Sequence, residues 1–366
     1  MRNKVKKKVV IITECRRWTC NYGETLQAVA LNRYISKLGY NTYTVHYQYC
    51  KDANNRALYE EDFENYILKV LRFEFFRKKY MKNSVVRTGD KNYIEKLLDD
   101  TSAVICGSDC IWYEKDYNEV FCLYFPEKKL RKISYAPSIR DNKIDNIKQY
   151  SANIQKWTKG IDFLSCREED GSHIIENITG RKCETVLDPT FLLSKDEWAS
   201  MSSRRRVKES YIFVYILGRS MRIAKILDQI SHHYPDRKIV WVRNSNNNGY
   251  NLGEVMEKVG PAQFLSLVRY ADLVLTDSFH GTAFSLIFNK QVVAIKRVVS
   301  RKDTYENDSR IKNIFKKLKI NNYYEVDENI DFNNLYIDYS TVAPILNEEI
   351  NNSKYFMEKA LMNLKE

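Results

Sequence analysis

Hydrophobic and polar positions in the first half of the chain alternate between short apolar runs and longer segments whose apolar side chains recur at helical spacing. The short runs have the length of buried strands, and the longer segments are typical of amphipathic helices. The predicted strands are Lys8–Thr13, Asn41–Tyr47, Ser102–Cys106, Lys132–Ala136, Phe163–Ser165 and Cys183–Leu187. The predicted helices are Asn21–Leu38, Tyr59–Tyr80, Ile144–Lys159 and Glu168–Asn177. This alternation favours a parallel sheet with helices on both faces.

A second alternation follows a polar, basic stretch at Lys195–Glu209, which we interpret as a linker. Its predicted strands are Ser210–Leu217, Lys238–Val242, Leu273–Thr276 and Val292–Ile295. Its predicted helices are Met221–His233, Pro261–Arg269 and Gly281–Phe288, and Asn244–Tyr250 is an exposed loop. Because 366 residues is long for one core, we predict two open α/β domains, 1–200 and 210–340. A C-terminal helix, Val342–Leu364 within 341–366, is expected to cross back onto the first domain.

Ligands of open parallel sheets bind beyond the carboxyl ends of the strands, and clefts between domains are favoured binding sites. Four loops at predicted strand ends carry candidate residues, and we expect them to converge on one cleft. The candidates in the first domain are Asn21, Gly23, Gly107, Ser108, Asp109 and Arg167. The fourth loop, in the second domain, carries His280.

The segment from Val274 to Phe288 is the most informative, because an apolar strand ends in a turn that leads into a helix. A histidine in such a turn titrates near neutral pH beside the free amides of a helix N-terminus, which attract anions. His280 is therefore a candidate acid, and the amides of Gly281 and Thr282 are candidate anion donors. Asp277 could tune the imidazole. The alternative is that Asp277 and Ser278 only cap the helix.

The other candidates also have two interpretations. The guanidinium of Arg167 suits a carboxylate or phosphate, or it pairs with Glu168 or Glu169. Asn21 is a simple helix cap or part of a ligand loop, in which Gly23 lets the ligand approach the backbone. The turn of Gly107, Ser108 and Asp109 caps the next segment or directs a hydroxyl and a carboxylate at a sugar. Arg310 precedes a helix and either reaches the cleft or lies on the surface.

Composition narrows the class of protein. Apolar residues make up 44% and aromatic residues 13%, which indicates a packed globular chain. No apolar run approaches the length of a membrane span, and Val9–Thr13 is too short for a signal-peptide core. We therefore expect a cytoplasmic protein. The eight cysteines lack the spacing of common metal sites, so we expect free buried thiols and no metal.

The net charge of +12 comes from scattered clusters such as Lys6–Lys8, Lys128–Arg131 and Arg204–Arg206. No nucleic-acid recognition motif accompanies them, so we expect no nucleic-acid partner. A multiply anionic small substrate explains the charge, and so does an anionic membrane surface that bears the acceptor.

Several short blocks occur in an order and spacing that resemble the polysaccharide pyruvyl transferases, from Asn21 to about Arg310. The blocks are Asn21–Ala28, Gly107–Trp112, Ser134–Ser138, Ser165–Glu169, Val186–Thr190 and Gly260–Thr282. The resemblance implies two Rossmann-like halves in a GT-B-like arrangement. It also implies transfer of pyruvate from phosphoenolpyruvate, as donor substrate, onto two hydroxyls of a glycan sugar. The product is a ketal, in cell-surface or exopolysaccharide biosynthesis, and no cofactor is implied.

The same resemblance implies residue roles. His280 matches the family's catalytic histidine, and Arg167 matches an arginine that holds the donor. Where some members carry an arginine two residues before the histidine, this chain has Ser278, so we expect Arg310 or Arg297 to supply that contact. Three further family positions differ in this chain, at Cys110, Tyr113 and Pro137.

Two other functions stay open at this point. One is a GT-B-like glycosyltransferase that uses a nucleotide sugar, and the other is a non-catalytic member that binds glycans or anions. The acceptor sugar, its attachment to a lipid and the oligomeric state are left open. A cytoplasmic location at the inner face of the membrane fits all of these expectations.

Overall fold

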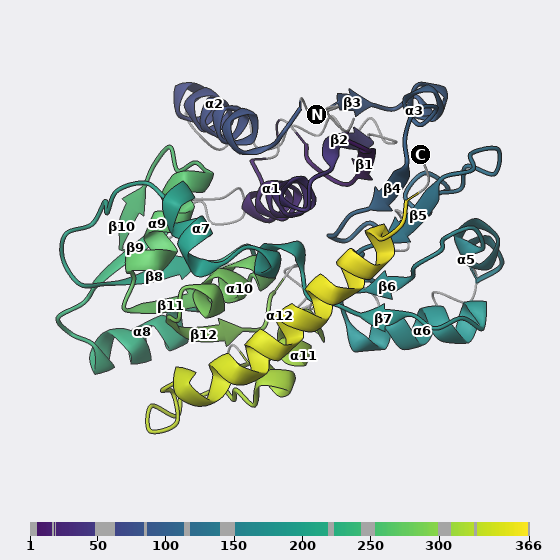
Figure 1. The fold of residues 1–366 in the computed structure, drawn as a ribbon. Coiled ribbons are helices and arrows are strands. Elements are labelled where there is room, and N and C mark those ends of the chain that lie inside the picture. The colour runs from purple at the N-terminus through teal and green to yellow at the C-terminus, as the bar shows by residue number, and fades with distance from the viewer. Residues whose placement is uncertain are drawn as a thin grey trace.

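A computed structural model gives the fold (Figure 1). It describes residues 6–16, 18, 20–47, 63–83, 86–112, 118–139, 151–218, 223–242, 253–298, 309–325 and 328–364. The first sheet has five parallel strands in the order β3-β2-β1-β4-β5. These strands are β1 (Lys8–Ile12), β2 (Asn41–Tyr47), β3 (Val86–Thr88), β4 (Ala103–Cys106) and β5 (Arg131–Ser134). Burial on both faces explains why β1 and β4 are apolar runs rather than alternating patterns.

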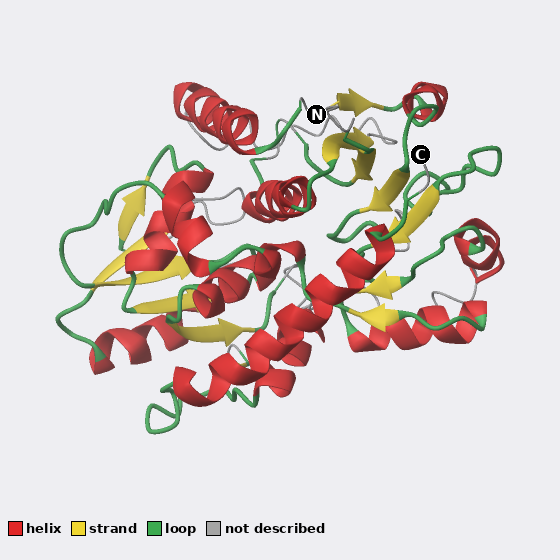
Figure 2. Ribbon diagram, in the orientation of Figure 1, coloured by secondary structure: helices red, strands yellow, loops and turns green. Residues whose placement is uncertain are grey.

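Helices and a small two-stranded sheet complete the first half of the chain (Figure 2). The small sheet pairs β6 (Ser165–Cys166) with β7 (Glu184–Thr185) in parallel. The helices are α1 (Tyr22–Lys37), α2 (Phe63–Tyr80), α3 (Lys91–Leu97), α5 (Ser151–Thr158) and α6 (Glu169–Thr179). A short 3-10 helix, η2 (Pro189–Leu192), follows β7 and leads toward the second half.

The second sheet has six strands in the order β10-β9-β8-β11-β12-β13, and all its pairings are parallel. Its strands are β8 (Tyr211–Tyr215), β9 (Lys238–Val242), β10 (Glu254–Met256), β11 (Leu273–Thr276), β12 (Gln291–Ile295) and β13 (Tyr323–Tyr324). Its helices are α8 (Ala224–His233), α9 (Pro261–Tyr270), α10 (Phe279–Ile287) and α11 (Ser309–Leu318). Two parallel α/β sheets are thus present, as the alternation predicted.

Apolar packing joins the two sheets near the start of α1. The ring of Tyr22 stacks on Phe264 of α9, with centroids 4.4 Å apart and planes 14° apart. The Tyr22 hydroxyl donates a hydrogen bond of 2.7 Å to the carbonyl of Val259. One hydrophobic cluster runs through both side chains and includes residues of both sheets. This packing holds the N-terminus of α1 against the second sheet's helices, which positions the candidate site between the halves.

The last helix, α12 (Tyr339–Leu361), runs diagonally between the two sheets (Figure 1). At its start, the Tyr339 hydroxyl donates to the carbonyl of Lys290, before β12. At its end, Glu358 accepts a hydrogen bond from Tyr34 in α1, and the carbonyl of Leu361 accepts one from Tyr40. The predicted crossing back is confirmed. The domain boundaries at 200, 210 and 340 stay a prediction.

Several sequence-based boundaries were wrong. The predicted linker begins with a helix, α7 (Lys195–Met201), because Ser194 and Glu197 form a capping box. The strand expected at Phe163–Ser165 is reduced to a bridge at Phe163, followed by β6. Some elements were not predicted: β3, α3, η2, β10 and β13. The predicted element starts at Tyr59, Ile144 and Met221, and the loop Asn244–Tyr250, lie outside the described residues.

Candidate active site

The histidine turn at the end of β11 forms the first turn of α10, two residues earlier than predicted. Ser278 is the N-cap, and its side chain accepts a hydrogen bond from the Gly281 amide at 3.4 Å. The Thr282 amide donates to the Ser278 carbonyl at 3.0 Å. The amides of Gly281 and Thr282 are therefore occupied, which corrects their assignment as anion donors. The first two amides of α10, those of Phe279 and His280, have no hydrogen-bond partner among the described residues.

Asp277 has a structural role in place of the expected tuning of His280. Its two carboxylate oxygens accept hydrogen bonds of 2.7 Å from the amides of Leu217 and Gly218, beyond the end of β8. The guanidinium of Arg297 donates to the Asp277 carbonyl at 3.0 Å. Asp277 thus joins the ends of β8 and β11, and Arg297 is bound there rather than in the cavity described below.

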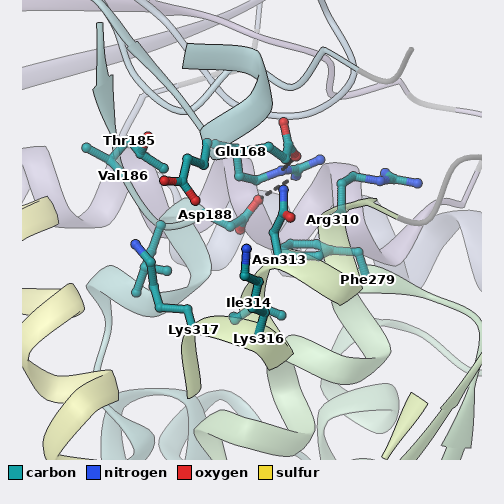
Figure 3. Close-up of a pocket in the computed structure, with 13 residues that line it drawn as sticks. Glu168, Thr185, Val186, Asp188, Phe279, Arg310, Asn313, Ile314, Lys316 and Lys317 are labelled. Carbon is teal, nitrogen blue, oxygen red and sulfur yellow. Dashed lines mark hydrogen bonds and ion pairs between the residues drawn. The ribbon is translucent and has the colours of Figure 1, made fainter. Parts of the chain in front are cut away.

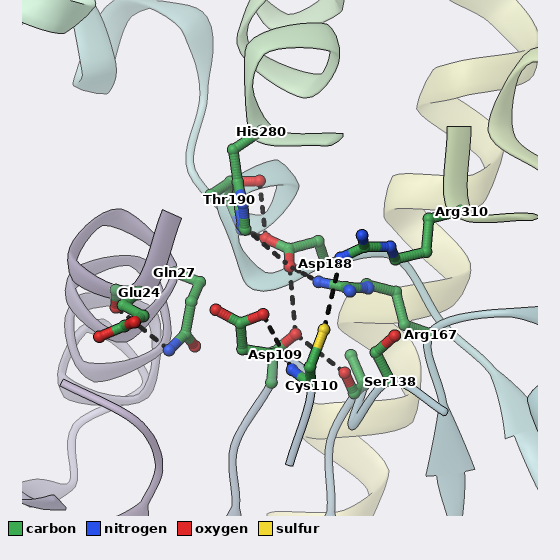
Figure 4. Close-up of polar contacts among 12 residues, drawn as sticks. Glu24, Gln27, Asp109, Cys110, Ser138, Arg167, Asp188, Thr190, His280 and Arg310 are labelled. Atoms are coloured by element: carbon green, nitrogen blue, oxygen red, sulfur yellow. Dashed lines mark hydrogen bonds and ion pairs between the residues drawn. The ribbon is translucent and has the colours of Figure 1, made fainter. Parts of the chain in front are cut away.

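Asp188 takes the place beside the imidazole, and the sequence did not single it out as a site residue. It is fully buried, and its Oδ2 lies 2.9 Å from Arg167 Nη1, 3.1 Å from Ser108 Oγ and 3.6 Å from His280 Nε2 (Figure 4). Its Oδ1 accepts hydrogen bonds from the amide and hydroxyl of Thr190. One carboxylate thus links three segments that are far apart in the sequence.

Electrostatics favours the charged forms of Asp188 and Arg167. Burial alone would raise the pKa of Asp188, but the charges of His280 and Arg167 and the Thr190 amide outweigh it, so the pKa lies well below the usual range. Burial would likewise lower the pKa of Arg167, and the carboxylates of Glu168 and Asp188 raise it instead. At 3.6 Å, His280 Nε2 is near enough to Asp188 for an ion pair when protonated but too far for a hydrogen bond.

Arg167 satisfies both interpretations of its sequence context. Its Nε donates to Glu168 at 2.8 Å, and its Cζ lies 4.5 Å from the centre of the Phe279 ring. Its Nη2 is buried and has no hydrogen-bond partner among the described residues. An unsatisfied guanidinium nitrogen is costly, so this atom marks a place where an acceptor group of a ligand would be stabilised.

The turn after β4 reaches the same cluster. Gly107 is required because a Cβ there would lie 2.7 Å from Thr13 Cβ. Ser108 contacts Asp188, as described above.

Asp109 has a φ of +87°, which is rare for aspartate, and its Oδ1 accepts a hydrogen bond of 2.8 Å from the Cys110 amide. Burial would raise the pKa of Asp109, but the charges of His280, Arg167 and Arg310 lower it. Asp109 is therefore a carboxylate that faces the cations of the site.

At the start of α1, Gly23 contacts the candidate site, whereas Asn21 does not. Asn21 is exposed and caps α1, accepting from the Glu24 amide and donating to the Glu24 carboxylate at 2.9 Å. This is the simple capping interpretation. Gly23 packs directly against the imidazole, since a Cβ on it would lie 2.6 Å from His280 Cε1 and closer still to Nδ1. The ring of His280 thus packs against Gly23 and faces Asp188, and both of these residues belong to the first half of the molecule.

A cavity of about 210 Å³ is lined in part by Asp188, the carboxylate that faces the imidazole (Figure 3). The part of its wall outside α11 consists of Arg167–Glu169, Thr185–Asp188 and Phe279, and α11 provides the rest. The residues of α11 in the wall are Arg310, Asn313, Ile314, Lys316 and Lys317. The cavity thus shares Arg167 and Asp188 with the cluster around His280. Cations of α11 line one side of it, and the carboxylates of Glu168, Glu169 and Asp188 line the other part.

The sequence analysis left the location of Arg310 open and did not identify Asn313, which is also on α11. Arg310 Nη1 lies 3.4 Å from Cys110 Sγ in the first half, so Arg310 does reach the cleft. Asn313 Nδ2 is buried without a hydrogen-bond partner among the described residues. The helical spacing of positions 310, 313 and 317 was the available signal, because it places them on one face of α11. Tyr113 lies outside the described residues.

No group of metal-ligating side chains is present among the described residues. The seven described cysteines are free, and all except the half-buried Cys110 are buried. Within that part of the chain, no helix is long and apolar enough to cross a membrane.

Solved structures of low sequence identity have the same fold. UDP-GlcNAc 2-epimerase from Methanocaldococcus jannaschii matches with a TM-score of 0.55 and 14% identity, over 94% of this chain and 93% of that one. The S. aureus MnaA–UDP structure matches with a TM-score of 0.54 and 11% identity, over 97% of each chain. The N-terminal domain of Candida albicans trehalose-6-phosphate phosphatase matches with a TM-score of 0.53 and 10% identity, over 99% and 98%. The GT-B-like arrangement of two Rossmann-like halves is confirmed.

Sequence comparison identifies the family. No curated protein matches the chain. The family model described as polysaccharide pyruvyl transferase matches residues 21–297, which include Gly23, Asp109, Arg167, Asp188 and His280. This range covers most of the chain, and the chain therefore belongs to the polysaccharide pyruvyl transferase family.

Proposed function

We propose that this chain transfers pyruvate from phosphoenolpyruvate onto two hydroxyls of a glycan sugar and releases phosphate. One observation carries the proposal. The guanidinium of Arg167 and the imidazole of His280, from opposite halves of the molecule, meet at the same oxygen of Asp188. An anion-binding group and a proton donor are thus placed together, as protonation of a bound enol phosphate requires. Family membership supports the same reaction.

In this proposal the donor's anionic groups occupy the cavity beside α11. Arg167 Nη2 and Asn313 Nδ2 are buried donors without partners among the described residues, and Arg310 and Lys316 line the same cavity. Phosphoenolpyruvate carries a phosphate and a carboxylate, which matches a site that offers several cationic and amide donors. Arg310, rather than Arg297, replaces the arginine that Ser278 does not provide.

The chemistry begins with proton transfer from the His280 imidazolium to the methylene carbon of the donor, which becomes a methyl group. A sugar hydroxyl adds to C2 as that carbon becomes electron-poor. A second hydroxyl then displaces phosphate by breaking the bond between C2 and the phosphate oxygen. Two protons leave the diol in the whole reaction, so that one replaces the proton lost by His280 and the other leaves with phosphate. Arg167 and Arg310 stabilise the charge on the departing phosphate.

We further propose that Asp109 acts on the acceptor sugar. The charges of neighbouring cations lower the pKa of Asp109, which favours the carboxylate form. Its backbone is in the left-handed conformation, and its Oδ1 accepts a hydrogen bond from the Cys110 amide. Its Oδ2 has no hydrogen-bond partner among the described residues. We assign it the role of orienting, and accepting the proton from, the attacking hydroxyl. Neither a metal nor a cofactor is needed in this scheme.

We place the reaction in the cytoplasm, at the inner face of the membrane, in the biosynthesis of cell-surface polysaccharide or exopolysaccharide. The positive net charge supports a location at an anionic surface.

The direct test is a screen of acceptor glycans with phosphoenolpyruvate. We expect phosphate release that depends on one class of glycan, together with a mass gain on that glycan of one pyruvate less one water. Thermal unfolding provides a second measurement, because a ligand that binds the native state raises the Tm. Stabilisation by phosphoenolpyruvate supports the proposal. Stabilisation by UDP-sugars alone, with transfer of the sugar, would instead favour a glycosyltransferase.

Replacing Gly23 with alanine tests whether the imidazole is the acting group. The new methyl group would overlap His280 and displace the ring, and a displacement of about 1 Å can cost roughly 10²-fold in rate. We expect that loss in kcat for phosphate release. In a His280→Gln background, the same Gly23→Ala change should cost almost nothing further. Gly39→Ala is the control, because Gly39 has a φ of +98° and open space around it, so it can lose stability without touching the site.

A further inference from the structure

The outward face of α2 carries an apolar stripe that no described element covers. Leu68, Leu71 and Phe75 are 37%, 55% and 67% exposed. Their spacing of three and four residues places them in one row along the helix. Among the described residues, eight large hydrophobic side chains are exposed, and three of them lie in this row. Single exposed hydrophobic residues are ordinary, whereas a continuous row is typical of an interaction surface.

The opposite face of α2 already provides the packing that the fold needs. Its side chains Tyr66, Val70, Phe73 and Phe76 are buried in the main hydrophobic cluster. Figure 1 shows α2 at the outer edge of the molecule, above α1 and α9. The outward row therefore does not contribute to the core, and its apolar character calls for another partner.

Basic residues continue and flank the row. Lys78 and Lys79 are exposed in the last turn of α2, and the exposed Lys82 follows its C-terminal end. The exposed Arg204–Arg206 follow the end of α7, and Ser200–Ser203 of that region form a groove with α2. Of the two carboxylates in the described part of α2, Glu64 is exposed and Glu74 is half-buried and paired with Arg77 and Arg87. The surface thus combines apolar side chains with an excess of positive charge.

The groove beside the row has a volume of about 480 Å³. Its wall includes Leu68, Leu71 and Phe75 with Arg72 and Lys79 of α2, and Ala262 and Gln263 of α9. Burial lowers the pKa of Arg206, and the nearby Arg72 lowers it further, so two guanidinium groups are close to each other here. Anionic groups at this position would relieve that repulsion.

We propose that the outward face of α2 docks the protein onto an anionic lipid bilayer, with Leu68, Leu71 and Phe75 inserted among the headgroups. A helix with large apolar side chains and flanking lysines lies in the plane of such an interface. The flanking lysines and arginines bind the headgroup phosphates of anionic lipids, and each adds to the attraction while the salt concentration is moderate. A protein partner would match the apolar row only if it also carried an acidic surface beside its apolar groove, whereas an anionic bilayer supplies both features together.

Vesicle co-sedimentation of the full chain tests the proposal. We expect binding to phosphatidylcholine vesicles that contain phosphatidylglycerol, and little binding to phosphatidylcholine alone. The variant Leu71→Ser, Phe75→Ser keeps every charge, and its binding should fall at least about tenfold because the inserted apolar area is lost. Tyr355→Ser is the matched control, since Tyr355 is 66% exposed on α12 and is outside the row. Phosphate release on a soluble acceptor should be unchanged in all variants.

Other results would overturn the proposal. Wild-type protein that stays in the supernatant with both kinds of vesicle rules out docking. Equal binding by the double-serine variant shows that net charge alone attracts the chain to vesicles. A dimer in sedimentation equilibrium that the same two substitutions dissociate would assign the row to a second copy of this chain. Replacing Lys78 and Lys79 with glutamate reverses the charge at both positions. In the same vesicle assay this variant should lose the preference for phosphatidylglycerol.

Discussion

Replacing His280 with glutamine is expected to abolish phosphate release from phosphoenolpyruvate while leaving the fold intact. Loss of a general acid typically costs about 10²–10⁴-fold in rate, and here the imidazole is the proton donor in the first step. The ring makes no hydrogen bond with another described residue, so its removal leaves Asp188 with its bonds to Arg167, Ser108 and Thr190. The measurement is acceptor-dependent phosphate release, with thermal unfolding recorded on the same samples.

A control distinguishes the loss of the acid from a general disturbance of the cleft. His173 is an exposed histidine near Glu169 and Glu176 on α6, and His173→Gln should leave the rate unchanged. Donor binding should also persist in His280→Gln, because Arg167 and Arg310 are still present. Turnover near the wild-type rate in the glutamine variant would remove His280 from the mechanism.

Replacing Arg167 with methionine is expected to reduce both stability and donor binding. The change would remove the guanidinium that is hydrogen-bonded to the buried carboxylates of Asp188 and Glu168, and breaking a buried ion pair by removing one partner costs about 3–5 kcal/mol. Phosphoenolpyruvate would lose the unsatisfied Nη2 as a donor, so it should no longer raise the Tm. Urea unfolding measures the first effect, and the thermal shift with donor measures the second.

Two further arginine variants keep this prediction testable if the methionine variant does not fold. Arg167→Lys retains the positive charge but loses the planar fork, so it should fold and show a raised KM for the donor. Arg237→Met removes a solvent-exposed ion pair with Asp272 and should cost no more than about 1 kcal/mol. If Arg167→Met were as stable as Arg237→Met, Arg167 would not be the central cation of the cluster.

The local pattern predicted much of the fold because strand and helix periodicities depend on neighbouring residues. The strand at Asn41–Tyr47 has the predicted bounds, and the helix from Tyr22 to Lys37 differs from its prediction by one residue at each end. Elements that lack a strong periodicity were missed. The capping box of Ser194 and Glu197 was a local signal for α7, but the basic composition around it favoured a linker.

The candidate site was predictable residue by residue but not as a constellation. His280 and Arg167 each follow a strand, and that position marks a ligand site in a parallel sheet. Asp188 was overlooked because an aspartate before Pro189 has the pattern of a helix cap, and it does cap η2 through Oδ1. Its functional contacts use the other oxygen, and the partners of that oxygen come from β4, β6 and α10. Sequence spacing cannot show which oxygen faces which segment.

The sequence by itself determined the two parallel α/β units, the histidine turn and the arginine after β6, since these follow from hydrophobic periodicity and from residue types at strand ends. Only the tertiary structure decided that Gly23 and Asp188 hold the imidazole, that Asp277 serves the strands, and that Arg310 reaches Cys110 across the cleft. These contacts join segments whose separation along the chain is large. They depend on how the two sheets and α12 pack against one another, and burial of apolar surface between the halves sets that arrangement.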